Sequence, residues 1–146
     1  MEEPGLRIVP YRPEHETAVI RLWHDCNLTR PWNDPRKDIA RKLADGEELF
    51  LVGLAGDRVI AAVMGGYDGH RGWIYYLGVH PDFRRRGYAR FMVNAVTERL
   101  KALGCPKINL MIRKDNTGAM GFYSRIGYQD DPVVLMSMRL ENDELP

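Results

Sequence analysis

Apolar residues recur along this chain with two periods, and the change from one period to the other marks the predicted elements. Short runs that are apolar at nearly every position predict buried strands, and apolar positions spaced three or four residues apart predict amphipathic helices. Six strands are predicted, at Leu6–Tyr11, Leu49–Leu54, Val59–Met64, Ile74–Val79, Ile108–Ile112 and Val133–Leu140. Four helices are predicted: Pro13 to Cys26, Pro35 to Gly46, a long helix after Arg84 that ends at Gly104, and Thr117–Ile126.

Residues that begin or end helices and turns fall between these segments. Asp34 precedes Pro35, which is the pattern of an N-cap and a first-turn proline, and Gly46 ends that helix. Gly56-Asp57 separates two strands and predicts a hairpin turn. The glycine-rich stretch 65–72 leads into a strand instead of a helix, so it predicts a turn and not a phosphate-binding loop.

The order of the predicted elements indicates an α/β fold with a mixed, mostly antiparallel sheet. The order is β-α-α-β-β-β-α-β-α-β, and a short extra strand at Tyr128-Gln129 is left open. Runs such as Leu49–Val52 lack polar alternation, so we expect helices to cover both faces of the sheet. A chain of 146 residues suits one core, so a single domain over residues 1–146 is predicted. The acidic tail from Glu141 is expected to fray.

Composition and charge narrow the classes of function. A net charge of +1 gives no extended positive field, so neither nucleic acid nor a membrane is expected as a partner. No apolar run approaches the ~20 residues that span a bilayer, and the acidic start lacks a signal-peptide core, so a cytoplasmic protein is expected. Cys26 and Cys105 form no Cys-x-x-Cys pair, which favours reduced, buried thiols. The histidines lack metal-ligand spacing, and Ser124 lies outside a Gly-x-Ser-x-Gly turn, so neither a metal nor serine-hydrolase chemistry is expected.

Three consecutive arginines, Arg84–Arg86, precede Gly87 at the start of the long predicted helix. A helix N-terminus carries about half a positive charge, so arginines there are unfavourable unless an anion neutralises them. Unpaired backbone N–H groups and guanidinium groups would together bind phosphate oxygens, and a glycine lets the backbone approach the ligand. A solvated basic turn is the alternative, and this segment alone leaves both open. The Walker and dinucleotide-binding patterns are absent, which argues against a P-loop nucleotide-binding protein.

Two segments, taken together, resemble the GNAT superfamily of N-acetyltransferases. Arg84-x-x-Gly87-x-Ala89 follows the strand that ends at Val79 and resembles the loop that binds the acetyl-CoA pyrophosphate. Asn116, followed by Gly121–Tyr128, resembles the second cofactor-side helix of that family. The resemblance extends over nearly the whole chain. The segments most similar to the small bacterial YpeA-type subgroup are Arg30–Pro35 and Gly65–Arg71.

The resemblance implies roles for particular residues. The strand at Leu77–Val79 would part from the Ile108 strand, so that its backbone pairs with the pantetheine arm and an N–H near Val79 polarises the thioester carbonyl. Asn116 would cap the last helix and touch the cofactor, and Tyr123, about two turns further on, would be the general acid. The alternatives are ordinary sheet pairing, a cap alone and a core aromatic. The predicted cofactor contacts are Leu77, Val79, Arg84, Arg85, Arg86, Gly87, Tyr88, Ala89, Asn116 and Tyr123.

A dedicated general base is the part of the family pattern that this sequence lacks. Many relatives carry a glutamate five residues before the asparagine, where this chain has Met111. An ordered water, the Asp68–His70 turn, or Tyr75-Tyr76 are the candidates, each with an equally good structural explanation, because turns favour Asp and strands favour Tyr. The loop between the first two helices lines the acceptor side in this family, although plain packing is the alternative for a Trp there. The predicted acceptor-side contacts are Trp32, Asp34, Asp68, His70 and Tyr75.

These inferences predict an acetyl-CoA-dependent N-acetyltransferase that moves an acetyl group to a primary amine by direct attack on the thioester. Acetyl-CoA is then a co-substrate, and no metal is required. The acceptor, a small molecule or a peptide, cannot be identified from the sequence, and a homodimer is left open. Two alternatives remain. One is a catalytically silent sensor of the same fold that binds acetyl-CoA, which Met111 keeps open; the other is a different nucleotide-binding regulatory domain.

Overall fold

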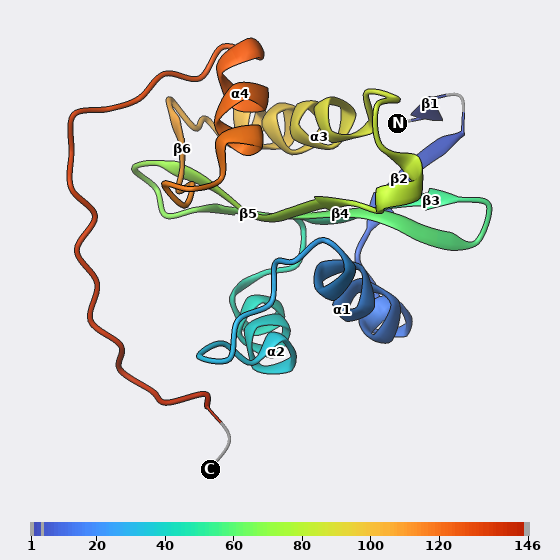
Figure 1. Cartoon of the computed structure of the whole chain (residues 1–146), viewed down its shortest axis with the longest axis horizontal. Helices are drawn as coiled ribbons and strands as arrows, with labels where there is room; N and C mark the ends of the chain where they lie inside the picture. Colours follow the sequence, from blue (N-terminus) through green and yellow to red (C-terminus); the bar gives the residue numbers. More distant parts are fainter. Residues whose placement is uncertain (1, 4, 145–146) are drawn as a thin grey trace.

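A computed structural model describes residues 2–3 and 5–144 of the chain (Figure 1). Its strands are β1 (Glu2–Glu3), β2 (Leu6–Pro10), β3 (Phe50–Ala55), β4 (Arg58–Tyr67), β5 (Gly72–Val79) and β6 (Ile108–Leu110). Its helices are α1 (Glu16–Asp25), α2 (Pro35–Asp45), α3 (Tyr88–Ala102) and α4 (Thr117–Arg125), with short 3-10 turns η1 (Pro13–His15) and η2 (Pro81–Phe83). The four predicted helices and five of the six predicted strands are confirmed, with ends that differ by a few residues.

The strands form one sheet in which spatial order follows chain order, β1-β2-β3-β4-β5-β6. Neighbours are antiparallel from β1 through β5, whereas β5 and β6 are parallel. Ala55 pairs with Arg58, so the predicted hairpin has a two-residue loop, and Gly56 takes the positive φ of +59° that such turns require. The parallel pair needs a crossover, which α3 supplies.

Helices cover both faces of the sheet, as predicted. In Figure 1, α3 and α4 lie on one side of the sheet and α1 and α2 on the other. On the α3 side, buried residues such as Ile60, Met92 and Leu100 form one core. On the α1 side, Trp23 and Phe50 belong to a second core. The sheet therefore separates two apolar layers, and strands buried on both faces explain the unbroken apolar runs.

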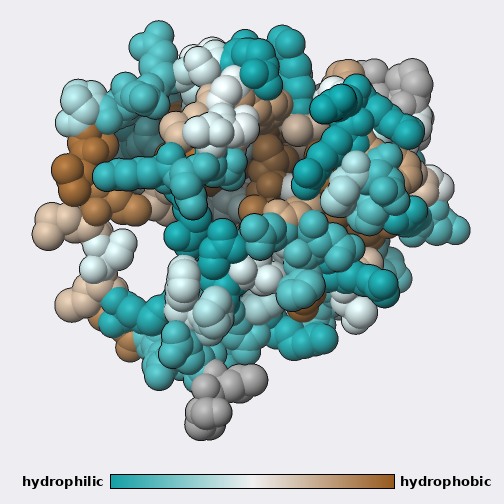
Figure 2. Space-filling model, in the orientation of Figure 1, coloured by the Kyte–Doolittle hydropathy of each residue, from teal (hydrophilic) through white to brown (hydrophobic). Residues whose placement is uncertain are grey.

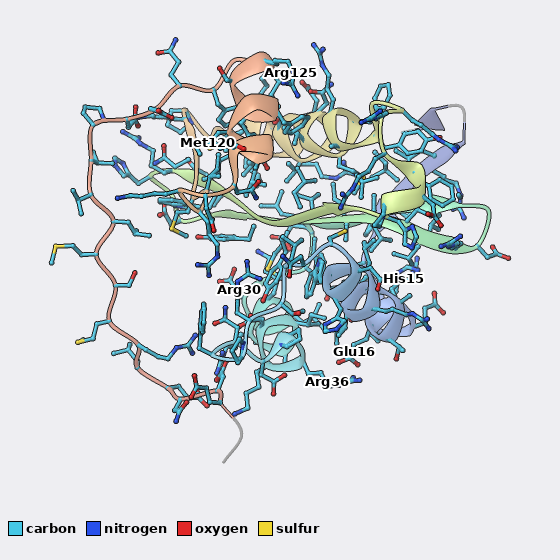
Figure 3. The ribbon with its side chains drawn as sticks, viewed as in Figure 1. His15, Glu16, Arg30, Arg36, Met120 and Arg125 are labelled. Atoms are coloured by element: carbon cyan, nitrogen blue, oxygen red, sulfur yellow. The ribbon has the colours of Figure 1, made fainter. Side chains whose placement is uncertain are left out.

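Helices α2 and α4 begin as the sequence indicates. The Asp34 carboxylate accepts a hydrogen bond from the Arg36 N–H at 3.0 Å and caps α2. The Asn116 side chain accepts from the Ala119 N–H at 3.0 Å and caps α4. Arg36 also pairs with Glu16 at 3.2 Å, and Figure 3 shows this pair joining α2 to α1. These contacts fix where the α1–α2 loop and the start of α4 lie.

The prediction of a last strand at Val133–Leu140 is wrong, and so is that of a short strand at Tyr128-Gln129. From 128 to 144 the chain is an irregular tail that leaves α4 and passes outside the sheet to the α2 side (Figure 1). Its apolar side chains are exposed; Met136, for example, is 88% exposed. An apolar run forms a strand only where an edge accepts its hydrogen bonds, and the two ends of this tail are held elsewhere. Lys107 pairs with Asp131 at 3.2 Å, and Asp143 is buried against α2.

Candidate active site

β5 continues for five residues beyond the point where β6 ends. Their pairing runs from Gly72 opposite Ile108 to Ile74 opposite Leu110 and stops there. Over Tyr75–Val79, β5 has no strand on that side among the described residues, although it stays paired with β4 on the other side. Backbone groups along this edge are therefore available to an extended ligand. We call this opening between β5 and β6 the notch.

A β-bulge lies in β5 beside the notch. Met64 pairs with Tyr75 and Ala62 with Gly78, so Val63 alone faces the two residues Tyr76 and Leu77. Tyr76 has φ +54°, a left-handed conformation that is unfavourable for a bulky side chain. Such strain is of order 1–3 kcal/mol and persists only where the surroundings hold it. Bulges next to active sites redirect the groups that follow them.

The side chain of Tyr76 is held from two directions. Its ring stacks on Trp23 with centroids 4.0 Å apart, and this stack continues through Phe50 to Tyr11 at 6.0 and 4.3 Å. The Tyr76 hydroxyl donates a hydrogen bond of 2.7 Å to the Asp38 carboxylate of α2. Burial first, and then the hydrogen bond to Asp38 and the charge of that carboxylate, raise the pKa of Tyr76 well above its usual value. A phenol held neutral in this way is a poor base, which argues against the candidate role of Tyr76 as the general base.

The arginine loop connects the end of β5 to α3. Gly87 has φ +79° and Arg85 has φ +65°, so the loop turns through two left-handed residues before the helix. Within the described part of the chain, the N-cap Gly87 gives α3 no side-chain cap and the first turn of α3 contains no acidic residue, so the helix itself does not offset the positive end of its dipole. The Arg84 Nε donates to the Val79 carbonyl at 3.3 Å, and Arg86 lies over the Phe83 ring.

The predicted cofactor contacts in this loop differ in their exposure and in the contacts that they make. Arg84 fixes the loop to the end of β5, and Arg85 is exposed. The ring of Tyr88 is buried in the α3-side core. Ala89 is half-buried in the first turn. The structure brings all four to one helix start, which is the arrangement that the sequence predicted.

Tyr123 of α4 is buried, with 8% of its surface exposed. Its ring packs edge-on against Phe122 and Tyr128, at centroid distances of 5.0 and 5.3 Å. No hydrogen bond of its hydroxyl to another described residue is present in the structure. Burial, with a small contribution from Tyr128, raises the pKa of Tyr123. The phenol is therefore protonated at all ordinary pH values and can donate a proton.

The surface is hollowed where these parts meet. Figure 2 shows a recess between α3 and the sheet, lined by apolar side chains and bordered by hydrophilic ones. The notch and the bulge belong to β5 and the arginine loop leads from β5 into α3, and β5 and α3 face each other in Figure 1. An apolar recess with one strongly positive end suits a ligand that has a long, weakly polar arm and an anionic group.

Comparison with known proteins agrees with this geometry. Residues 17–128 match the sequence profile of the Acetyltransferase (GNAT) family. The chain belongs to the GNAT acetyltransferase family. A relative named acetyltransferase from Yersinia enterocolitica is 49% identical over 126 residues, which cover 86% of this chain and 89% of the relative. Another, from Sodalis glossinidius, is 47% identical over 140 residues, covering 95% and 99%.

Solved structures show the same fold. An aminoglycoside 6'-N-acetyltransferase from Acinetobacter haemolyticus superposes with a TM-score of 0.73 at 18% identity, covering 92% of this chain and 99% of that one. The alanine N-acetyltransferase of a ribosomal protein from Escherichia coli also gives 0.73, at 16% identity, covering 86% and 79%. This protein is thus a GNAT-fold acetyltransferase, and the predicted fold class and enzyme class are confirmed.

Within this GNAT fold, the predicted acceptor-side residues on the β4–β5 turn have local structural roles. The Asp68 carboxylate accepts from the N–H groups of Arg71 and His70 at 2.7 and 2.8 Å and from the Trp73 indole at 3.3 Å. These backbone hydrogen bonds, that of Arg71 first, lower the pKa of Asp68, which weakens it as a base. His70 is exposed at the tip of the turn. Tyr75 is 39% exposed on β5, and burial followed by the Asp68 charge raises its pKa.

The α1–α2 loop reaches toward the loop after β6. The Arg113 guanidinium lies over the Trp32 ring, 5.4 Å from its centroid. Trp32 is still 41% exposed, so the predicted acceptor-side residue presents part of its ring to solvent. Asp34 caps α2 with one carboxylate oxygen. Met111 is half-exposed in the same loop as Arg113, and no carboxylate follows it before Asp115.

Sequence reasoning missed the residues that hold the bulge. Asp38 and Trp23 occupy ordinary helix positions, and no sequence signal marks a tyrosine that takes positive φ. Cys26 and Cys105 are free, as predicted, but half-buried instead of buried. Among residues 2–3 and 5–144, no helix has the length and apolar character to cross a membrane. The same residues contain no His, Cys, Asp or Glu cluster that could hold a metal ion.

Proposed function

We propose that this GNAT protein transfers the acetyl group of acetyl-CoA to a primary amine by direct attack on the thioester. The observation that supports this most strongly is the unpaired β5 edge over Tyr75–Val79, with a bulge inside it and the uncapped start of α3 at its end. A thioester on a pantetheine arm needs backbone partners along its length, and its pyrophosphate needs a positive end. The β5 edge offers the backbone partners, and the start of α3, which follows it, offers the positive end.

The residues present fit acetyl-CoA. Arg85 and the N–H groups at the start of α3 would bind the pyrophosphate, and the positive φ of Gly87 is needed for the loop to turn toward it. The β5 edge from Leu77 to Val79 would pair with the pantetheine arm. Asn116 would reach the arm from the start of α4 while keeping its cap. Tyr123, on the same helix, would lie near the sulfur.

The chemistry then follows from the positions of these groups. The amine nitrogen forms a bond to the acetyl carbon, while a backbone N–H at the end of β5 stabilises the developing negative charge on the carbonyl oxygen. The carbon–sulfur bond breaks, and the Tyr123 hydroxyl gives its proton to the departing thiolate. The surplus amine proton passes to water, because Met111 provides no carboxylate. The products are an amide and free CoA, and Tyr123 regains its proton from solvent.

Two measurements test the proposal. Acetyl-CoA at a hundredfold excess over its dissociation constant should stabilise the protein by roughly 3 kcal/mol in a thermal-shift assay. ATP and NAD should neither match this nor compete with acetyl-CoA. Thiol release should then appear with at least one acceptor in a panel of polyamines, amino acids, aminoglycosides and peptides.

The outcomes separate the competing functions. No shift at millimolar acetyl-CoA would remove the proposal altogether. Binding without thiol release for any acceptor would favour the acetyl-CoA sensor, and competition by nucleotides would favour the nucleotide-binding domain. The two solved enzymes named above act on very different amines, so the acceptor has to come from the panel.

A further inference from the structure

The tail after α4 is attached to α2 by a buried acidic residue. The carboxylate of Asp143 is fully buried and accepts two hydrogen bonds of 2.9 Å from the Arg41 guanidinium. It also accepts from the Asp34 N–H at 3.4 Å, and Glu141 pairs with Arg41 at 3.0 Å. Arg139 of the same tail bonds the Asn33 side chain. The tail is thereby held against the α1–α2 loop and the first turns of α2.

The contacts continue from this attachment to the bulge. The same Arg41 guanidinium pairs with Asp38 at 3.4 Å, one turn earlier on α2. Asp38 uses its other carboxylate oxygen to accept the 2.7 Å hydrogen bond from Tyr76. A continuous chain of hydrogen bonds and ion pairs therefore runs from Asp143 through Arg41 and Asp38 to the strained residue in β5.

We propose that Asp143 is a positioning residue for acetyl transfer, acting through Arg41 and Asp38 on the β5 bulge at Tyr76. This inference rests on the proposed function. The left-handed backbone of Tyr76 sets the direction of the backbone groups that follow it, and these include the N–H that would polarise the thioester. Tyr76 keeps that conformation because its ring is stacked and its hydroxyl is bonded to Asp38. Asp38 makes this hydrogen bond with one carboxylate oxygen while its other oxygen pairs with Arg41, which in turn is held by Asp143.

Removing the charge of Asp143 changes the ion pairs that Arg41 makes with the carboxylates around it. The guanidinium, which is 43% exposed, loses both contacts to Asp143 and keeps Asp38 and Glu141 as carboxylate partners, at 3.4 and 3.0 Å. We expect the guanidinium to move closer to Asp38 and to draw that carboxylate away from the Tyr76 hydroxyl. The ring stack alone does not fix the rotation of the following peptide. A displacement of about 1 Å at a reacting group can cost up to a hundredfold in rate.

A merely structural tail anchor would behave differently. It would lower the melting temperature and the fraction of folded enzyme, while each folded molecule kept its kcat. A positioning residue lowers kcat at nearly constant KM for acetyl-CoA, since the residues of the arginine loop keep their own contacts, such as that of Arg84 with the Val79 carbonyl. It also shows coupling with Tyr76, although the two side chains do not touch.

The experiment is a double-mutant cycle with Asp143→Asn and Tyr76→Phe in the full chain. We expect each single variant to lose about tenfold in kcat, within the range of networks that couple distant groups. The double variant should lose little more than either single variant. Glu144→Gln, an exposed change one residue away, is the matched control and should keep wild-type kcat. Additive losses, or an Asp143→Asn variant with wild-type kcat, would overturn the proposal.

A second measurement does not depend on activity. The backbone amide signals of Tyr76 and Leu77 in NMR spectra should shift in Asp143→Asn and stay in place in Glu144→Gln. If Asp143→Asn does not fold, Arg41→Lys, which keeps the charge and loses the two-pronged contact, replaces it in both measurements. Unshifted amides in a folded variant would refute the coupling. Because this readout needs no acceptor, it separates failure of this inference from failure of the proposed acetyl transfer.

Discussion

The Tyr123→Phe variant tests the proposed acid directly. The change removes one oxygen atom and leaves the ring, so the edge-on contacts with Phe122 and Tyr128 persist. The raised pKa of Tyr123 means that the hydroxyl keeps its proton across any practical assay range. The variant therefore removes a proton donor and does not alter a titration below pH 10.

The structure indicates how much Tyr123→Phe should change the stability and the kcat. Since the hydroxyl bonds no other described residue, its removal orphans no partner, and the free energy of unfolding should change by no more than about 0.5 kcal/mol. General-acid catalysis is worth about a hundredfold or more. A hundredfold loss corresponds to about 2.7 kcal/mol in the activation barrier. The variant should therefore be as stable as the wild type and at least about a hundredfold slower in kcat.

Tyr128→Phe is the matched control, because it removes the same atom from the neighbouring ring. Tyr128 is only partly buried and has no role in the proposed proton transfer, so this variant should fold like the wild type and keep a kcat within about twofold of it. Thiol release under saturating acetyl-CoA gives kcat, and urea unfolding gives stability. A folded Tyr123→Phe enzyme with wild-type kcat would eliminate the acid role and leave Tyr123 as a packing residue.

Three further predictions concern binding, pH and capping. Gly87→Val should lose at least about 1 kcal/mol of stability to backbone strain and most of the acetyl-CoA thermal shift. Gly104→Val, at a similar φ of +84° far from the loop, should show the strain and keep the shift. The Arg41 guanidinium lowers the pKa of Asp143 to about 2, below its unfolded value, so its contribution is present above about pH 4. That contribution is lost as the pH falls from 4 toward 2, and melting curves of Asp143→Asn should lack this part of the acid dependence. Asn116→Ala should cost about 1 kcal/mol through the lost cap, measured by urea unfolding, and weaken acetyl-CoA binding.

Much of this arrangement is readable from local sequence patterns. The Asp34 cap, the Gly56-Asp57 turn and the Asn116 cap are each set by residues within a few positions, so the sequence predicts them and the structure confirms them. Helices on both sheet faces follow from strands such as β3 that are apolar throughout. The arginine loop is likewise local, and its position at the start of α3 agrees with the prediction.

The features that escaped prediction depend on residues far apart in the chain. The apolar tail has the composition of a strand, but its ends are fixed by Lys107 and by Arg41, which no local pattern reveals. The bulge has the same origin. Tyr76 takes a conformation that its residue type disfavours, because Asp38 and Trp23 hold it from other elements. Local propensity gives no sign of a bulge there, because it is tertiary contacts that hold Tyr76 in this conformation.

The order of the strands in the sheet has a consequence for how the protein folds and unfolds. β3, β4 and β5 are joined by short turns, so their pairing closes small loops and can form early, whereas β6 must wait for the whole α3 crossover. We therefore expect the pairing of β5 with β6 to form later than the hairpins of β3, β4 and β5, as does the long-range pairing of β2 with β3. A ligand that binds beside β5 and β6 can contact both strands only after they have paired. Acetyl-CoA bound there would slow unfolding far more than it speeds refolding, so an enzyme saturated with its donor would also outlast the empty one against heat and proteases.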